Sequence, residues 1–277
     1  AKRGAQGLVG DAKVCLEKIS TALGSHRFAN PDAAVRKDWF ATTDALMADP
    51  GANALPTDAQ VIGAVQRQTG KQSVVMCAAG TMPGALHVLW RAAQGGYHME
   101  YGYSCMGYEV AGAMGIKMAA PDKDVVCMVG DGSYMMANSE LATAVMMGIP
   151  FTVVLTDNRG YGCINRLQKG TGGAPFNNLL DDSYHVNPLH IDFVAHAASM
   201  GAIARKAASI AELETMMAEA KTATLPTVIL IETDPIPGTG AGGTWWDVAV
   251  PEVSDRAEVN KARKGYEEAT RRQWLGN

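Results

Sequence analysis

Two short polar motifs follow apolar runs of this sequence, where metal and phosphate chemistry is feasible. Gly130, Asp131, Gly132 and Ser133 come directly after the run 124–129, and Asn158 comes soon after the run 151–156. Ligands of open α/β sheets bind at the carboxyl ends of the strands. If the two runs are neighbouring parallel strands, these ends lie about 4.8 Å apart. Asp131 and Asn158 would then be close enough to bind one ion between them.

The residue types favour Mg²⁺ shared with a diphosphate. Mg²⁺ prefers an octahedron of oxygen ligands and is often shared with phosphate oxygens. Asp131 offers a carboxylate and Asn158 a neutral carbonyl oxygen, and a backbone carbonyl of the glycine-rich turn offers a third ligand. Gly130 and Gly132 let the main chain approach a diphosphate, and Ser133 can donate a hydrogen bond to it. Either motif alone is common in turns, so the prediction depends on the pair.

The elements that must position these motifs follow from the apolar pattern. Short β-branched runs are typical of strands buried on both faces of a parallel sheet, and they occur at 72–77, 124–129, 151–156 and 227–233. Helical patterns occur at 138–147, which opens with a capping Asn138, and at 191–200 and 209–220. This alternation predicts a doubly wound, mainly parallel α/β sheet with right-handed crossovers.

The first 55 residues have a different pattern. A short run at 7–10 leads into a helical pattern at 11–23, and a polar stretch with Pro and Gly breakers follows. This segment is too short to bury a core of its own. We expect residues 1–55 to be the end of a preceding central domain and a linker. Residues 56–277 then form the site-bearing domain, with a surface helix after Glu252.

Composition excludes several classes of protein. The 277 residues carry 24 Lys and Arg against 28 Asp and Glu, which gives a formal net charge of −4. The sequence has no basic stripe, so it predicts no nucleic-acid surface. A hydrophobic fraction of 47% excludes a disordered chain. The sequence has no apolar run of about 18 residues, so it predicts no membrane span.

Cellular location and nucleotide binding are also constrained. The five cysteines are scattered without a CxxC pair, and no secretory signal is evident, so we expect core thiols and a cytoplasmic protein. No GxGxxG motif follows a predicted strand. An ordinary dinucleotide-binding Rossmann domain is therefore disfavoured.

The motifs together resemble a known group of enzymes. GDGS followed by Asn158 resembles the pattern of thiamine-diphosphate enzymes of the acetolactate synthase/pyruvate decarboxylase superfamily, and the similarity spans about residues 56–235. Residues 1–23 resemble the closing strand and helix of the central domain of that superfamily. Within it, the strings at 97–109, 158–165 and 245–248 resemble the ring-opening hydrolases of inositol catabolism.

The resemblance implies a set of cofactor ligands. Mg²⁺ would be bound by Asp131, Asn158 and the Gly160 carbonyl. The aminopyrimidine edge would be bound by the Ser104 carbonyl and the Met106 amide, and Met106 would also wedge between the two cofactor rings. The diphosphate would be held by a third set of residues, namely Gly130, Gly132, Ser133, Tyr161 and Gly162, with Gly80 and Thr81 at the end of an earlier strand.

The resemblance also implies an activity and a missing partner. The reaction would be hydrolytic C–C cleavage that opens a trihydroxylated cyclic 1,2-dione, with carbanion chemistry supplied by thiamine diphosphate. The essential Glu of the family lies on a pyrimidine-binding domain, which nothing before residue 56 can supply. This chain would then hold half a site, completed by missing N-terminal sequence or another chain in a homo-dimer or tetramer. An acetolactate synthase-like carboligase and a non-catalytic cofactor-binding fragment remain as alternatives.

Three further sets of residues have weaker claims to function. His98 is a candidate substrate contact, although a structural role is favoured. Glu100 and Glu109 fit solvated or salt-bridged roles at least as well as catalytic ones. Trp245 and Trp246, among glycines, would either cover the site or attach the C-terminal tail to the core.

Overall fold

The computed structural model describes residues 7–27, 33–51, 55–100, 102–187, 189–239 and 248–273. These residues contain a six-stranded, all-parallel sheet in the order β2-β1-β3-β4-β6-β5. The strands are β1 (Ser73–Cys77), β2 (Tyr97–Met99), β3 (Asp124–Gly130), β4 (Thr152–Asp157), β5 (Ile203–Ala207) and β6 (Thr227–Glu232). The four predicted strands are therefore confirmed as β1, β3, β4 and β6.

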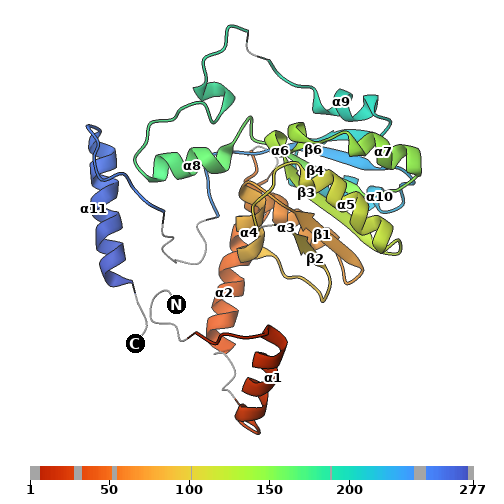
Figure 1. The fold of residues 1–277 in the computed structure, drawn as a ribbon. Coiled ribbons are helices and arrows are strands. Elements are labelled where there is room, and N and C mark those ends of the chain that lie inside the picture. Colours follow the sequence, from red (N-terminus) through yellow and green to blue (C-terminus); the bar gives the residue numbers. More distant parts are fainter. Residues whose placement is uncertain are drawn as a thin grey trace.

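Helices cover both faces of this sheet (Figure 1). One hydrophobic cluster joins the sheet to α3 (Asp58–Gln68), α4 (Thr81–Leu89) and α10 (Ile210–Ala220). A second cluster joins the opposite face to α5 (Tyr108–Ala119), α7 (Glu140–Met147) and α9 (Phe193–Ser199). The predicted doubly wound α/β fold is thereby confirmed.

The central strands are apolar on both faces because both faces are covered. Along β3, Val126 and Met128 belong to the first cluster, whereas Val125, Cys127 and Val129 belong to the second. All five side chains are almost fully buried. Burial of a side chain of this size stabilises the fold by about 1.5–3 kcal/mol, so each central strand contributes to two cores.

The turns around the predicted motifs differ from the sequence interpretation. The Asp131 motif is the first turn of a short helix, α6 (Asp131–Met136), and Thr81, expected at the end of a strand, is the first residue of α4. Asn138 does not cap α7, whose N-cap is Ser139. Instead, the Asn138 side-chain amide donates to the Tyr134 carbonyl, because α6 ends just before it.

The N-terminal segment contains two helices. The predicted first helix is confirmed as α1 (Ala12–Leu23) with Asp11 as its N-cap, but residues 7–10 form no strand, because a lone strand has no partner to pair with among the described residues. A second helix, α2 (Ala33–Leu46), lies where a linker was expected. Arg91 donates to Asp44 Oδ1 over 2.7 Å, so the end of α2 is attached to the sheet-bearing part. The division at residue 55 stays a prediction.

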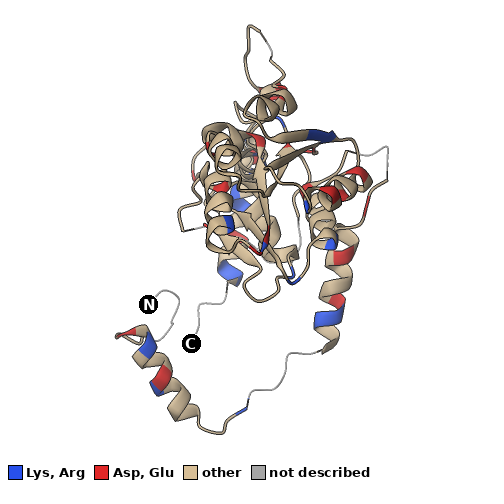
Figure 2. Ribbon diagram, turned by 90° about the vertical axis from the view of Figure 1, so that its right-hand side faces the viewer, with Lys and Arg blue, Asp and Glu red and all other residues tan. Residues whose placement is uncertain are grey.

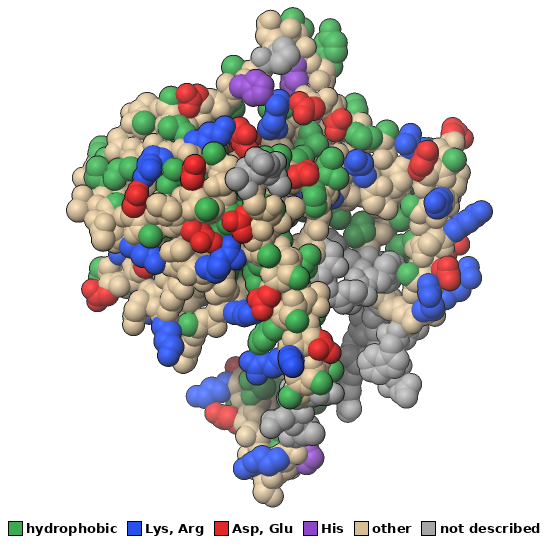
Figure 3. Space-filling model, turned by 180° about the vertical axis from the view of Figure 1, so that it is seen from behind, with side chains coloured by type: hydrophobic (Ala, Val, Ile, Leu, Met, Phe, Trp, Pro, Cys, Tyr) green, Lys and Arg blue, Asp and Glu red, His purple; other side chains and the backbone are tan. Residues whose placement is uncertain are grey.

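The C-terminal part confirms the expected surface helix as α11 (Ala257–Arg272), in which only Val259 is buried. Acidic and basic residues alternate along its sequence. They are also interspersed over the sheet-bearing part (Figure 2), behind which α11 lies in that view, and in the reverse view α11 is the separate column rich in Lys and Arg (Figure 3). It lies apart from the sheet, near α8 (Gly162–Gly170), which precedes a 3-10 turn, η2 (Leu180–Asp182). Trp245 and Trp246 lie outside the described residues. No described helix is long and apolar enough to cross a membrane.

Candidate functional site

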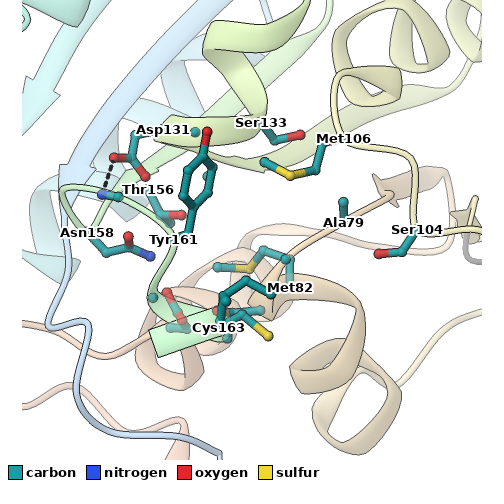
Figure 4. Close-up of a pocket in the computed structure, with 18 of the residues that line it drawn as sticks. Ala79, Met82, Ser104, Met106, Asp131, Ser133, Thr156, Asn158, Tyr161 and Cys163 are labelled. Carbon is teal, nitrogen blue, oxygen red and sulfur yellow. Dashed lines mark hydrogen bonds between the residues drawn. The ribbon is translucent and has the colours of Figure 1, made fainter. Parts of the chain in front are cut away.

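A cavity of about 290 Å³ lies at the carboxyl ends of β1, β3 and β4 (Figure 4). Gly130 pairs in register with Thr156, so the predicted adjacency of the two motif-bearing strands is confirmed. The predicted residues that line the cavity are Gly80, Thr81, Ser104, Met106, Gly130, Asp131, Gly132, Ser133, Asn158, Gly160, Tyr161 and Gly162. The fold thus brings all the predicted metal and cofactor residues to one place.

Each of the two predicted metal-binding side chains in this cavity has an oxygen atom without a hydrogen-bond partner among the described residues. Asp131 Oδ2 accepts from the Gly160 amide over 2.8 Å, but Asp131 Oδ1 is unpaired. Asn158 Oδ1 is also buried and unpaired. Buried polar atoms are almost always paired, so such atoms indicate a missing ligand. A carboxylate and an amide oxygen are donors that Mg²⁺ accepts, and these residues therefore fit a divalent cation.

The charge state of Asp131 supports this interpretation. Burial and, to a smaller extent, the nearby Asp157 charge raise the pKa of the Asp131 carboxyl to about 7, although the hydrogen bond from the Gly160 amide opposes both effects. A divalent cation at this position would favour the ionised carboxylate. The protein has therefore placed an acid where its charge is costly without a positive partner.

The loop that presents Asn158 has an unusual backbone. Arg159 has φ 62° and Gly160 has φ 142°. The chain at 178–180 holds this loop, because the Tyr161 amide donates to the Asn178 carbonyl (2.6 Å) and the Leu180 amide donates to the Arg159 carbonyl (2.9 Å). A Cβ at Gly160 would lie 2.4 Å from the Asn178 carbonyl oxygen. Glycine is therefore required here, and the role of 178–180 had no signal in the sequence.

Two helices of nine residues begin at the cavity wall. α4 follows Gly80 and α8 follows Tyr161, and neither N-cap residue makes a side-chain capping hydrogen bond. First-turn amides lack helical partners, and the positive end of the helix dipole favours anions. This wall therefore fits the phosphate groups that the sequence predicts.

Close packing explains one glycine of the GDGS motif. A Cβ at Gly132 would lie 2.6 Å from Cε1 of the Tyr161 ring. The ring stands beside Asp131 in Figure 4, between the two motif loops. Gly132 thus allows Tyr161 to pack against the start of α6.

The Met106 loop forms the opposite side of the cavity. The Met106 side chain is directed towards the middle of the cavity, close to Ser133 (Figure 4). Ser104, two residues earlier, has φ 53°, and the following Gly107 has φ 91°. Strained backbone of this kind persists where the surroundings impose it, often at binding sites. The loop is therefore built to present Met106 in one position.

The sequence analysis missed a second buried acid in the same cavity. Asp58 is 4% exposed, lines the cavity, and neither carboxylate oxygen has a hydrogen-bond partner among the described residues. Burial raises its pKa to about 6, although Arg166, 3.9 Å away, opposes the shift. Arg166 also donates to Thr81 Oγ1 (2.5 Å) and to the Pro235 carbonyl (2.6 Å).

The sequence around Asp58 gives no chemical signal. Thr57 and Gln60 form a capping box at the start of α3, so Asp58 has the appearance of an ordinary first-turn acid. Other cavity-lining residues that the sequence analysis missed are apolar or small, namely Ala79, Met82, Thr156, Cys163, Ile164 and Leu167.

His98, the candidate substrate contact, does not line this cavity. It lies on the edge strand β2, and its Nε2 is 3.1 Å from the Tyr108 hydroxyl. Glu100 accepts from the Cys105 amide (2.8 Å), and Glu109 accepts from amides and a hydroxyl. Within the described part of the chain, neither glutamate forms the salt bridge considered from the sequence.

Comparison with known proteins adds a family. The family described as thiamine pyrophosphate enzyme, C-terminal TPP binding domain, matches residues 78–231. The chain is 44% identical over 195 residues to the 3D-(3,5/4)-trihydroxycyclohexane-1,2-dione hydrolase of Halalkalibacterium halodurans, covering 69% of this chain and 30% of the relative. It is 35% identical over 292 residues to the protein of the same name from Geobacillus thermodenitrificans, covering 94% and 46%. The chain therefore spans less than half the length of these relatives.

Solved structures agree on the fold. The thiamine diphosphate-dependent 4-hydroxybenzoylformate decarboxylase of Rhodococcus jostii RHA1 superposes with a TM-score of 0.58 at 23% identity, covering 68% of this chain and 34% of that one. Benzoylformate decarboxylase from Polynucleobacter necessarius gives 0.59 at 19% identity, covering 69% and 36%. At these identities the similarity concerns the fold alone.

Proposed function

Because this chain belongs to the thiamine pyrophosphate enzymes and contains their C-terminal TPP binding domain, we propose that its cavity binds thiamine diphosphate through Mg²⁺. The observation that carries the proposal is the pair of unpaired oxygens, Asp131 Oδ1 and Asn158 Oδ1, at the ends of neighbouring strands. The family match includes both residues.

Each residue of the cavity then has a specific task. Asp131, Asn158 and the Gly160 carbonyl bind the metal ion, which neutralises part of the diphosphate charge. Gly80, Thr81, Gly162 and their neighbours present helix N-termini to the phosphates.

The Met106 loop has the second task. Ser104 and Met106 hold the organic part of the cofactor and fix its orientation, so that the chain positions the reactive carbon. When bound, thiamine diphosphate supplies carbanion chemistry at its thiazolium carbon.

The reaction follows from the names of the relatives. The chain would contribute to hydrolytic ring opening of 3D-(3,5/4)-trihydroxycyclohexane-1,2-dione, a C–C cleavage in myo-inositol catabolism, because the similar proteins carry that name. It spans less than half their length, so the remaining length would supply the pyrimidine-binding domain with its Glu. Completion of the site by that domain in another protomer would require a homo-oligomer.

Calorimetry with purified chain tests the cofactor. We expect thiamine diphosphate to bind in the presence of Mg²⁺, and binding to disappear with EDTA. Binding that is unaffected by EDTA would contradict the metal-bridged arrangement, and no binding at any Mg²⁺ concentration would contradict the proposed function.

Turnover assays test the reaction. The chain alone should not open the cyclic dione, and turnover should require the N-terminal portion of a relative. Ring opening by the chain alone would contradict the half-site. Acetolactate formation from pyruvate in the completed assembly would favour a carboligase, and cofactor binding without turnover of either substrate would favour a non-catalytic fragment.

A further inference from the structure

Glu109 is a buried acid for which the proposed function has no use. It is the second residue of α5, is 1% exposed, and does not line the cavity. A buried carboxylate is costly unless hydrogen bonds compensate it. Its partners therefore indicate why it is there.

Three segments of the chain donate hydrogen bonds to this one carboxylate. The Ala79 amide, after β1, donates to Oε1 over 3.2 Å, and the Gly107 amide, before α5, donates to Oε2 over 3.0 Å. The Ser133 hydroxyl, on α6, lies 2.8 Å from Oε1 and 2.7 Å from Oε2. Ser133 Oγ in turn accepts from the Gly107 amide over 2.9 Å. Glu109 thus joins the ends of two strands to the Met106 loop.

These partners are the wall of the cofactor cavity. Ala79 and Ser133 line it directly, and Gly107 follows Met106, which also lines it. Figure 4 shows Ala79, Met106 and Ser133 on one side of the cavity, opposite Asn158. Glu109 therefore lies one layer behind the surface that would face the organic part of the cofactor.

A carboxylate fits this arrangement. Two amides and a hydroxyl all present hydrogens, and a carboxylate accepts at both oxygens. A glutamine would turn its own N–H₂ towards one of these donors. Burial raises the pKa of Glu109, and the hydrogen bonds from Ser133, Ala79 and Gly107 oppose that shift. Burial is the larger effect, so the pKa stays above its ordinary value, and the three donors limit the rise.

Gly107 transmits the constraint to Met106. Its backbone has φ 91°, and a Cβ there would lie 3.0 Å from the Ala137 Cβ, so the loop is closely packed against the chain after α6. The N–H group that donates a hydrogen bond to Glu109 Oε2 belongs to the peptide bond between Met106 and Gly107. Holding this peptide fixes the direction in which the Met106 side chain leaves the loop.

We propose that Glu109 is a positioning residue of the cofactor site, whose carboxylate joins Ala79, Gly107 and Ser133 so that Met106 is held against the organic part of thiamine diphosphate. This inference rests on the proposed function, because it assumes that thiamine diphosphate is the ligand. Glu109 acts through Met106 and touches neither the metal nor the diphosphate.

Calorimetry with two ligands tests this role. Mg²⁺–pyrophosphate reports the metal and phosphate site, whereas Mg²⁺–thiamine diphosphate also reports Met106. We expect Glu109→Gln to weaken thiamine diphosphate binding by about 10-fold or more and pyrophosphate binding by less than about 3-fold. Glu268→Gln, an exposed acid on α11, serves as the matched control and should change neither affinity.

A double-mutant cycle separates positioning from general damage. If Glu109 acts through Met106, Glu109→Gln in a Met106→Ala background should weaken thiamine diphosphate binding by less than about 3-fold. Equal losses for both ligands, or an undiminished loss in the Met106→Ala background, would overturn the proposal.

Two further outcomes keep the test decisive. If Glu109→Gln does not fold, Glu109→Asp keeps the charge, shortens the reach of the carboxylate to its three donors and changes no residue assigned to the diphosphate, and it should weaken thiamine diphosphate binding more than pyrophosphate binding. Equal losses would again overturn the role of Glu109. A wild-type chain that binds neither ligand would contradict the proposed function itself.

Discussion

Within the part of the chain that the structure describes, Asp131 Oδ1 and Asn158 Oδ1 are buried without a hydrogen bond, as are both carboxylate oxygens of Asp58, which lies 3.9 Å from the Arg166 guanidinium. All three residues line one cavity. A folded chain tolerates such groups at a cost in stability, which a ligand can offset. At the residue scale, the cavity is therefore a place where stability and binding oppose each other.

Asp131→Asn should separate these two quantities. The amide keeps the shape but removes the charge that a divalent cation needs, so Mg²⁺-dependent binding of thiamine diphosphate should weaken by about 100-fold. Because burial raises the pKa of Asp131 to about 7, the neutral variant should unfold no more readily than wild type. Calorimetry and urea unfolding measure the two effects. Asp122→Asn, at an exposed turn, should leave both unchanged, and full Mg²⁺-dependent affinity in Asp131→Asn would refute the metal site.

Asp58 gives a prediction for pH. Its folded pKa of about 6 exceeds the ordinary value of 3.8, so its contribution to stability is fully present below pH 3.8 and is lost as the pH rises through 6. The whole shift corresponds to roughly 3 kcal/mol, part of which is already lost at pH 4. The free energy of unfolding of wild type should therefore fall by roughly 2 kcal/mol relative to Asp58→Asn between pH 4 and pH 7.

Urea unfolding across this range measures the difference. Asp131 and Glu109 are present in both proteins, so their contributions to the pH dependence of stability cancel. The charged groups that act on Asp58 are Arg166 and Asp234. If the free energies of unfolding of wild type and Asp58→Asn change in parallel with pH, Asp58 does not titrate in this way.

The residues of the site were predictable to the extent that they lie in the two motifs. Asp131 and Asn158 could be identified because a hard cation needs oxygen ligands at adjacent strand ends. Asp58 and Glu109 could not, since each is set at the start of a helix, where acids are ordinary. Only the packing of distant segments shows that these two acids are buried.

At the scale of elements, the central strands were predictable and the edges were not. β3 and β4 are apolar on both faces, whereas β2 has three partly exposed residues and β5 carries Arg205 and Lys206. Charged or short edge strands are a common protection against pairing with other chains, and this obscures their pattern. α2 was missed because its polar sequence lies between the breakers at Pro31 and Pro50, and α4 was missed because it contains Pro83 and Gly84.

Gly172 should control how α11 is attached. It has φ 85°, its carbonyl accepts from Arg256 Nε, and a Cβ would lie 2.4 Å from the Glu258 carbonyl oxygen. Gly172→Ala should lower the free energy of unfolding by at least about 2 kcal/mol and expose α11 to proteases. Gly170→Ala, where a Cβ meets nothing within 4 Å, is the matched control. Equal stability and equal cleavage rates in the two variants would show that α11 is held elsewhere.

At the scale of the whole molecule, α1 is the element that packs least. None of its residues is buried, and Val14, Leu16, Ile19 and Leu23 are all exposed. Figure 1 shows it below the sheet-bearing part, beyond α2. Exposed apolar stripes mark surfaces that other chains or domains cover. The length of the relatives beyond this chain could supply such a cover.

Deletion of residues 1–27 tests that interpretation. Because α1 contributes no buried side chain, the melting temperature should change by less than about 2 °C, and self-association should decrease. Thermal unfolding and sedimentation measure these effects. A loss of more than about 5 °C would show that α1 stabilises the sheet-bearing part.

The backbone hydrogen bonds between residues 178–180 and the loop at 159–161 determine when the site becomes ordered. The protein meets the entropic cost of arranging Asn158 and Gly160 during folding, and the incoming ion does not have to meet it again. The proposed metal ligands would therefore form a preorganised receptor, in contrast to sites that assemble only around their metal. Under the proposed function, cofactor would leave and return while the fold remains intact.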